Sequence, residues 1–210
     1  MPTTETFSVP HDADEGYLEL RRGGTRITIR AGGNDALCSA RFERVTPRAV
    51  VRGGRVSIEY PRFSLAGLAR HRAHRAEIEL SPMLPWSIAV DGGLGDSSID
   101  LRGLELRAFQ LAGGASELRL MLPIARGTVP VRIAGGASKL TLLRPRGVAA
   151  VLRVIGGGSR LAFDGERYGS IGGETRLETP NADSVQDRYE VEIAGGASEL
   201  TISEHDGGDE

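Results

Sequence analysis

The sequence is poor in several residue types, and each shortage excludes a class of protein. It has one cysteine, Cys38, so no internal disulfide can form, and we expect a small buried apolar side chain there. Aromatic residues make up only 5%, so the core must consist mainly of Leu, Ile, Val and Ala. Of the 26 basic residues only Lys139 is a lysine, a bias that we attribute to genome composition rather than to binding.

Charge and hydropathy exclude further classes. The formal net charge is −2, so no overall field favours nucleic acid or an anionic membrane. No apolar run approaches the ~18 residues of a membrane-spanning helix, and MPTTETFSVPHDADEG at the start has no secretory signal pattern. We therefore expect a cytoplasmic protein without a transmembrane segment, which a partner could hold at the inner face of the membrane.

Glycine, in contrast, is abundant, and much of it recurs in one motif. LAGGASELRL at 111–120, IAGGASKLTL at 133–142 and IAGGASELTI at 193–202 are near copies. The second glycines of the GG pairs lie 21, 39, 21, 22, 21 and 39 residues apart, at Gly33, Gly54, Gly93, Gly114, Gly136, Gly157 and Gly196. A period of this length is typical of repeat architectures. Each long spacing is expected to hold one extra, degenerate unit.

Apolar residues on both sides of the GG pairs alternate with a period of two, as at Val131 and Ile133 or Leu140 and Leu142. This alternation predicts strands with one buried face, and no segment sustains a helical period. We predict an all-β, single-stranded β-solenoid (β-helix) with coils of 21–22 residues and about 7–9 coils. Residues 1–16 are expected to form an extended lead-in, 17–203 the solenoid and 204–210 a flexible acidic tail.

The repeated corner is expected to stack on itself from coil to coil. Glycine would supply a positive φ there, and the small residues that follow would let coils lie about 4.8 Å apart. One column would contain Ala115, Ala137, Gly158 and Ala197. If coils stack in chain order, the outward residues Glu117 and Lys139 form an opposite-charge pair, and Lys139 and Arg160 a like-charge pair.

Three stretches resemble the toastrack domain, the adhesin-like β-solenoid found at the C-terminus of LiaF-like proteins of the cell-wall-antibiotic response. They are GGNDALCSARFE at 32–43, GGRVSIEYPR at 53–62 and, most specific, LPWSIAVDGGLGDSSIDLRGLELRAFQLAGGAS at 84–116. The resemblance extends over about 17–203. It implies a non-catalytic interaction module that works with a protein partner in bacterial envelope stress signalling, and it brings no active site. Family members often carry N-terminal transmembrane helices, which this sequence does not contain.

Two segments carry side chains with a candidate chemical role. DGGLGDSSID at 91–100 partly matches the calcium-binding β-roll motif, but Asp96 falls one place early and the motif is not repeated in tandem, so we interpret it as a solvated corner. ARHRAHRAE at 69–77 is the densest run of charge and lacks the further ligands that a metal needs. We predict a partner-binding surface there, at Arg70, His71, Arg72, His74 and Arg75.

The sequence contains no Ser–His–Asp arrangement, nucleophile elbow, phosphate loop or nucleotide fingerprint. We therefore predict a protein that is not an enzyme and has no catalytic, cofactor-binding or metal-binding residues. Two alternatives remain. One is a self-assembling, bactofilin-like scaffold that stacks end to end through its terminal coils. The other is a carbohydrate-active enzyme, which would need two or three carboxylates converging on one groove.

Overall fold

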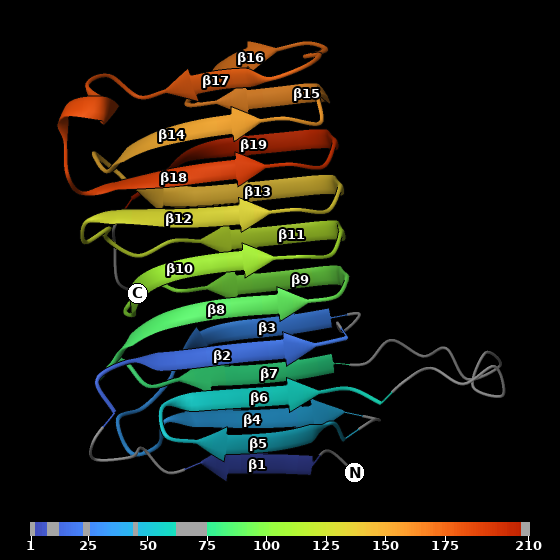
Figure 1. Cartoon of the computed structure of the whole chain (residues 1–210), viewed down its shortest axis with the longest axis vertical. Coiled ribbons are helices and arrows are strands. Elements are labelled where there is room, and N and C mark those ends of the chain that lie inside the picture. Colours follow the sequence, from blue (N-terminus) through green and yellow to red (C-terminus); the bar gives the residue numbers. More distant parts are fainter. Residues whose placement is uncertain (1–2, 8–12, 23–25, 44–45, 62–74, 207–210) are drawn as a thin grey trace, which may run out of the picture.

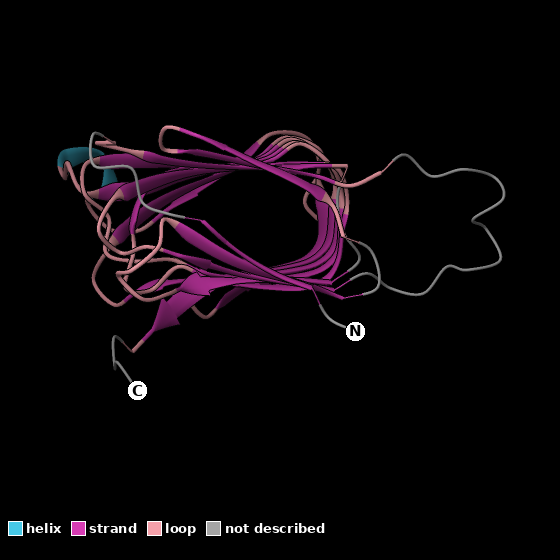
Figure 2. Cartoon of the chain, turned by 90° about the horizontal axis from the view of Figure 1, so that it is seen from below, coloured by secondary structure: helices cyan, strands magenta, loops and turns pink. Residues whose placement is uncertain are grey.

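The computed structural model describes residues 3–7, 13–22, 26–43, 46–61 and 75–206. Two sheets face each other, and the chain passes repeatedly from one sheet to the other (Figure 1 and Figure 2). One turn of 3₁₀ helix, Ala182–Ser184, is the only helical element in this part of the chain. The predicted all-β fold is confirmed.

The strands of each sheet form a single row along the long axis of the molecule. The ten-stranded sheet has the order β1 (Thr3–Phe7), β4 (Cys38–Glu43), β7 (Arg75–Leu80), β3 (Arg26–Ala31), β9 (Leu94–Asp100), β11 (Ala115–Met121), β13 (Ala137–Pro145), β19 (Ala197–His205), β15 (Gly158–Phe163) and β16 (Glu166–Tyr168). The nine-stranded sheet has the order β5 (Arg48–Arg52), β6 (Arg55–Glu59), β2 (Gly16–Arg21), β8 (Pro85–Asp91), β10 (Glu105–Leu111), β12 (Thr128–Ile133), β18 (Arg188–Ile193), β14 (Ala149–Val154) and β17 (Thr175–Glu178).

Strands inside the rows run parallel, and strands at the ends run antiparallel. Strands that pair with their neighbours only in parallel include β8, β9, β10, β11, β12, β13, β18 and β19. At one end β1 pairs antiparallel with β4 and β5 antiparallel with β6, and at the other β16 and β17 pair antiparallel with β15 and β14. The antiparallel strands therefore cap a parallel centre at both ends (Figure 1).

The core lies between the two sheets and is built from the alternating apolar positions. Leu140 and Leu142 are 1% and 0% exposed, and Val131 and Ile133 of the facing sheet are equally buried. Equivalent residues of neighbouring strands lie side by side, as in the pair Leu140 and Leu200. Burying each such side chain stabilises the fold by roughly 1.5–3 kcal/mol, so these columns are the main source of stability.

The order of the strands departs from chain order at two places. β18 and β19, the last strands, lie between β12–β13 and β14–β15. β2 and β3, near the start, lie between β6–β7 and β8–β9. The predicted alanine column forms, but with Ala197 between Ala137 and Gly158. The expectation of stacking in chain order is therefore wrong, and Glu199 separates Lys139 from Arg160.

The backbones of neighbouring corners nearly touch at the first glycine of four GG pairs, Gly113, Gly135, Gly156 and Gly195. A Cβ on Gly135 would lie 2.4 Å from the carbonyl carbon of Gly113, and a Cβ on Gly195 would lie 2.4 Å from that of Gly135. No side chain fits there unless a backbone moves. The expectation of a positive φ is wrong for Gly113, Gly135 and Gly195, which are outside the left-handed region, whereas Gly92 and Gly157 of two other GG corners do have positive φ, at 131° and 75°. Close stacking is the reason for glycine.

The two long spacings between GG pairs do not each hold a further copy of the repeat. Between Gly157 and Gly196 the chain forms the end strands β16 and β17 before it returns to β18. Gly54 lies in the turn between β5 and β6, so it belongs to a hairpin rather than to the corner column. Strands also extend beyond 17–203, because β1 begins at Thr3 and β19 ends at His205.

In the part of the chain that the structure describes, no helix has the length and hydropathy needed to cross a membrane.

Candidate functional site

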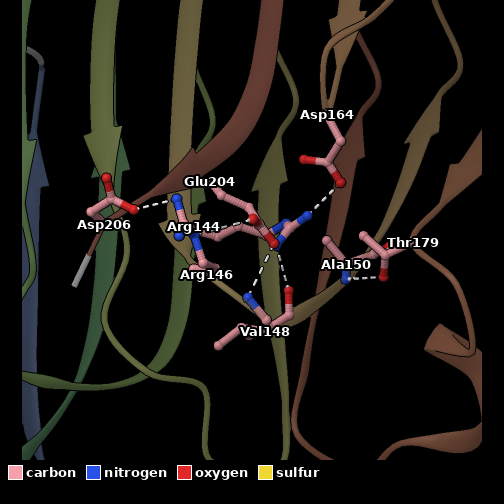
Figure 3. A network of polar contacts seen from close by, with 9 residues as sticks. Arg144, Arg146, Val148, Ala150, Asp164, Thr179, Glu204 and Asp206 are labelled. Carbon is pink, nitrogen blue, oxygen red and sulfur yellow. Dashed lines mark hydrogen bonds and ion pairs between the residues drawn. The ribbon is translucent and has the colours of Figure 1, made fainter.

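A buried arginine, Arg144, joins three segments at the end of β13 (Figure 3). Its side chain is only 2% exposed. Nη1 donates hydrogen bonds to the carbonyl oxygen of Val148 at 2.7 Å and to Oε1 of Glu204 at 2.9 Å, and Nη2 donates to Oδ2 of Asp164. The guanidinium therefore ties β13 to the end of β19 and to the turn after β15.

Local backbone geometry positions both carboxylates. Asp164 and Gly165 form the two-residue turn between β15 and β16, and their φ values of 48° and 88° are those of a tight hairpin turn. Gly147, with φ of 78°, begins the return from β13 to β14, and its N–H donates to Oε1 of Glu204 at 3.0 Å. Glu204 is in register with Arg144 on the adjacent strand.

These donors keep Glu204 ionised. The hydrogen bond from the N–H of Gly147 contributes most to lowering the pKa of its carboxyl group, and the hydrogen bond from Arg144 adds to this; partial burial opposes both. Arg146 is exposed and lies 4.0 Å from Oε2 of Glu204, while its Nη2 is 2.5 Å from Oδ1 of Asp206. The carboxylate of Glu204 is thus stabilised as an anion.

Beside this network lies an open cavity of about 630 Å³. Its polar lining includes Arg144 and three acids, Asp164, Asp187 and Glu204, and its apolar lining includes Val148, Ala149, Pro180 and Val185. Oδ1 of Asp187 accepts a hydrogen bond from the N–H of Gly127 at 2.6 Å. Three carboxylates and one guanidinium line the cavity, so its lining carries a net negative charge, which favours a positively charged or hydrogen-bond-donating group.

The predicted partner-binding residues lie mostly outside the described residues, as Arg70, His71, Arg72 and His74 do. The fifth, Arg75, is the first residue of β7, in register with Arg26 on one side and Glu43 on the other.

Asp96, from the partial β-roll motif, forms an ion pair with Arg26, with 2.8 Å between Oδ2 and Nη2. Among the described residues no group of three or more His, Cys, Asp or Glu side chains is placed to hold a metal ion.

The Arg144 network was not predicted from the sequence because its members lie 20 and 60 residues apart in the chain. One signal was available. Arg144 follows Leu140 and Leu142 in the same alternation, so it occupies a position that faces inward. A charged residue at an inward position requires partners from elsewhere in the fold.

These features define an all-β repeat protein in which two mostly parallel sheets enclose one apolar core. Residues 3–143 match the family model described as the N-terminal domain of toast_rack, DUF2154. The match covers more than half of the sequence, so the chain belongs to the toast-rack family, as the resemblance in the sequence indicated. No curated protein matches the chain.

Two solved structures are similar in fold. One is a "putative cell adhesion protein" from Clostridium sporogenes; it is 18% identical, the match covers 97% of this chain and 98% of that one, and the TM-score is 0.73. The other is a "putative adhesin" from Bacteroides fragilis, with 8% identity, coverage of 98% and 97%, and a TM-score of 0.38. The first shows that the two chains share a fold, and the second is too dissimilar to support an argument.

Proposed function

We propose that the protein is a non-catalytic interaction module, and the observation that carries this proposal is the electrostatics of the Arg144 cavity. Its acids are held by fixed donors: Glu204 by Gly147 and Arg144, Asp164 by Arg144, and Asp187 by Gly127. A carboxylate held in this way can bind a cationic group, and Glu204, whose pKa is lowered, is a poor proton donor near neutral pH.

The same electrostatics weigh against a carbohydrate-active enzyme at this cavity. Glycoside hydrolysis needs one carboxylic acid that stays protonated, and hence a raised pKa, beside a second carboxylate. The pKa of Glu204 is shifted in the opposite direction. We therefore favour binding over hydrolysis.

We further propose that the fold is a β-solenoid of seven coils. The pairs that would form them, in stack order, are β6–β7, β2–β3, β8–β9, β10–β11, β12–β13, β18–β19 and β14–β15. The parallel register between these pairs supports the proposal, as does the stacking of the GG corners that contain Gly113, Gly135, Gly195 and Gly156.

The ends of the stack weigh against the bactofilin-like scaffold. The edge strands at one end, β16 and β17, have only three and four residues. At the other end β5 begins and ends with arginine, at Arg48 and Arg52. Short and charged edge strands discourage the addition of another chain, so we favour a module that does not polymerise through its ends.

We propose that the partner is a protein, that it binds at residues 70–75, and that the module acts in the cytoplasm in the response to cell-envelope stress. The support is the resemblance to LiaF-like proteins and the density of positive charge in that segment. The name of the Clostridium sporogenes protein, which refers to cell adhesion, is consistent with an interaction role.

The test is a binding experiment with matched charge changes. The variant replaces Arg70, Arg72 and Arg75 with Gln, and the control replaces three exposed arginines on other segments, Arg107, Arg119 and Arg126, with Gln. A protein that the parent retains from the native lysate should be lost with the first variant and kept with the control, at equal melting temperatures. Equal retention by both would refute the proposed surface.

A further inference from the structure

The two coils that lie out of chain order, β2–β3 and β18–β19, occupy positions that the leucine column and the glycine corners do not specify. Leu140, Leu200 and Leu161 of β13, β19 and β15 share one column of equal size, whereas the next column contains Leu142, Ile202 and Phe163. The close-packed glycines Gly135, Gly195 and Gly156 are identical. The leucine column and the corners would therefore accept β14–β15 directly on β12–β13, which is the chain order.

The outward charges do distinguish the two orders at the C-terminal coil. Glu199 of β19 lies in register between Lys139 of β13 and Arg160 of β15. On the other sheet Glu192 of β18 lies in register between Arg132 of β12 and Arg153 of β14. We call each such set a charge triplet: three side chains in register on adjacent strands, in which the middle charge is opposite to both neighbours.

Interatomic distances and pKa shifts support these triplets. Nη2 of Arg160 is 3.3 Å from Oε2 of Glu199, and Nη1 of Arg153 is 3.8 Å from Oε2 of Glu192. The pKa of Lys139 is raised, first by its hydrogen bond to Glu117 and further by the charge of Glu199. Removing β18–β19 from its place would bring cations together about 4.8 Å apart in both sheets.

The N-terminal inserted coil shows the same arrangement with the signs reversed. Arg21 of β2 lies in register between Glu59 of β6 and Asp91 of β8. The pKa of Arg21 is raised, first by its hydrogen bond to Glu19 and further by Glu59 and Asp91.

On the other sheet Arg30 of β3 is paired with Glu79 of β7. The register between β3 and β9 ends at the pair Ile29 and Ile99, one residue before Asp100, so this sheet adds the ion pair with Glu79 and not a triplet. The C-terminal inserted coil thus separates two like charges on each of the two sheets, and the N-terminal inserted coil does so on the nine-stranded sheet.

We infer that these three charge triplets select the order of the coils, and that they do so by disfavouring the stack in which the strands follow the chain. The competing explanation for the coil order is that contacts outside the triplets hold β18 in place. The hydroxyl of the buried Tyr189 donates to the carbonyl oxygen of Pro123 at 2.7 Å, and Asp187 accepts from Gly127. An exchange of charges that leaves these contacts in place separates the two causes.

The experiment exchanges charges between the last two coils and reads the order by disulfide formation. The exchanged variant carries Arg153→Glu, Arg160→Glu, Glu192→Arg and Glu199→Arg, so that chain order now pairs opposite charges. Thr141, Thr201 and Ala162 share an uncharged outward column. Both cysteine pairs are made in a Cys38→Ala background. In the observed order residues 141 and 201 are on adjacent strands, so T141C/T201C reports that order; in chain order residues 141 and 162 are adjacent, so T141C/A162C reports chain order. Residues two strands apart, at about 9.6 Å, cannot be bridged by a disulfide.

With parent charges, T141C/T201C should form a disulfide on mild oxidation and T141C/A162C should not. In the exchanged variant the yield of the T141C/A162C disulfide relative to the T141C/T201C disulfide should rise at least about tenfold. An unchanged ratio in a folded exchanged variant would show that Tyr189 and Asp187, rather than charge, hold β18–β19 in place.

Single reversals test the inference if the exchanged variant does not fold. Glu192→Arg places three cations in register across the sheet, whereas Glu190→Arg faces the uncharged Pro130 and Val151 across the sheet and meets a cation only at Arg188 on its own strand. Glu192→Arg should lower the melting temperature by about 2–4 °C more than Glu190→Arg. Equal melting temperatures for these two variants would overturn the inference.

Discussion

Replacing Gly135 with alanine tests the claim that glycine is present at the corners because of backbone contact. The new Cβ would lie 2.4 Å from the carbonyl carbon and oxygen of Gly113 and 2.5 Å from the nitrogen of Gly114. A Cβ is in ordinary van der Waals contact with a neighbouring heavy atom from 3.4 Å outward, so the neighbouring corner has to move away by about 1 Å. That corner is held by the hydrogen bond from the N–H of Ala134 to the carbonyl oxygen of Leu111, at 2.9 Å.

The expected cost follows from these contacts. Overpacking a rigid site costs about 1–3 kcal/mol, and each weakened hydrogen bond adds about 0.5–1.5 kcal/mol. Alanine lowers the conformational entropy of the unfolded chain, which offsets about 0.4–1 kcal/mol of this cost. With this one hydrogen bond weakened, Gly135→Ala should therefore lower the free energy of unfolding by about 2 kcal/mol. Equilibrium urea denaturation measures this as a lower midpoint.

Two other glycines serve as controls. A Cβ on Gly169 meets nothing within 4 Å and its φ is not left-handed, so Gly169→Ala should be neutral or slightly stabilising. A Cβ on Gly147 also meets nothing, but its φ is 78°, so Gly147→Asn should be tolerated better than Gly147→Ala. At Gly135, asparagine should be no better than alanine. Equal stability of Gly135→Ala and Gly169→Ala would refute the steric explanation.

Three further predictions concern the core, the Arg144 network and the cysteine. Leu140→Asp places a carboxylate at a position that is 1% exposed, and it should remove about 4 kcal/mol or more in urea denaturation; an unchanged midpoint would contradict the inward register. Because the pKa of Glu204 is lowered from 4.5 in the folded protein, its contribution to stability is complete above that pH and is lost as the pH falls through the folded pKa. The melting temperature of the parent should therefore fall more steeply below about pH 4.5 than that of Glu204→Gln, and parallel curves would argue against the network. Burial raises the pKa of Cys38 to about 12, so thiol reagents should label it slowly in the native protein and quickly in urea; rapid native labelling would contradict its burial.

Several features could be predicted from the sequence because they depend on local pattern. The alternation at Val131 and Ile133 specifies which face of a strand is buried, whichever strand lies beside it. The repeated GGAS places Ala115, Ala137 and Ala197 at equivalent corners, so their shared column follows from periodicity. The ion pair between Glu117 and Lys139 follows from the same spacing, and Nζ of Lys139 is 2.8 Å from Oε1 of Glu117.

The candidate site could not be predicted in this way. Arg144, Asp164 and Glu204 have no common motif, and the turn that carries Asp164 does not indicate which strand end it faces. Their meeting depends on β19 lying between β13 and β15, which brings Glu204 beside Arg144.

Periodicity alone thus accounts for the strands, the inward leucines and the glycine corners, because each depends on residues within about one coil. Which coil lies next to which depends on contacts between segments 60 or more residues apart, and coils of nearly identical apolar pattern leave that choice open. The tertiary structure resolves it by placing Glu199 between Lys139 and Arg160, a position in which opposite charges meet on both sides.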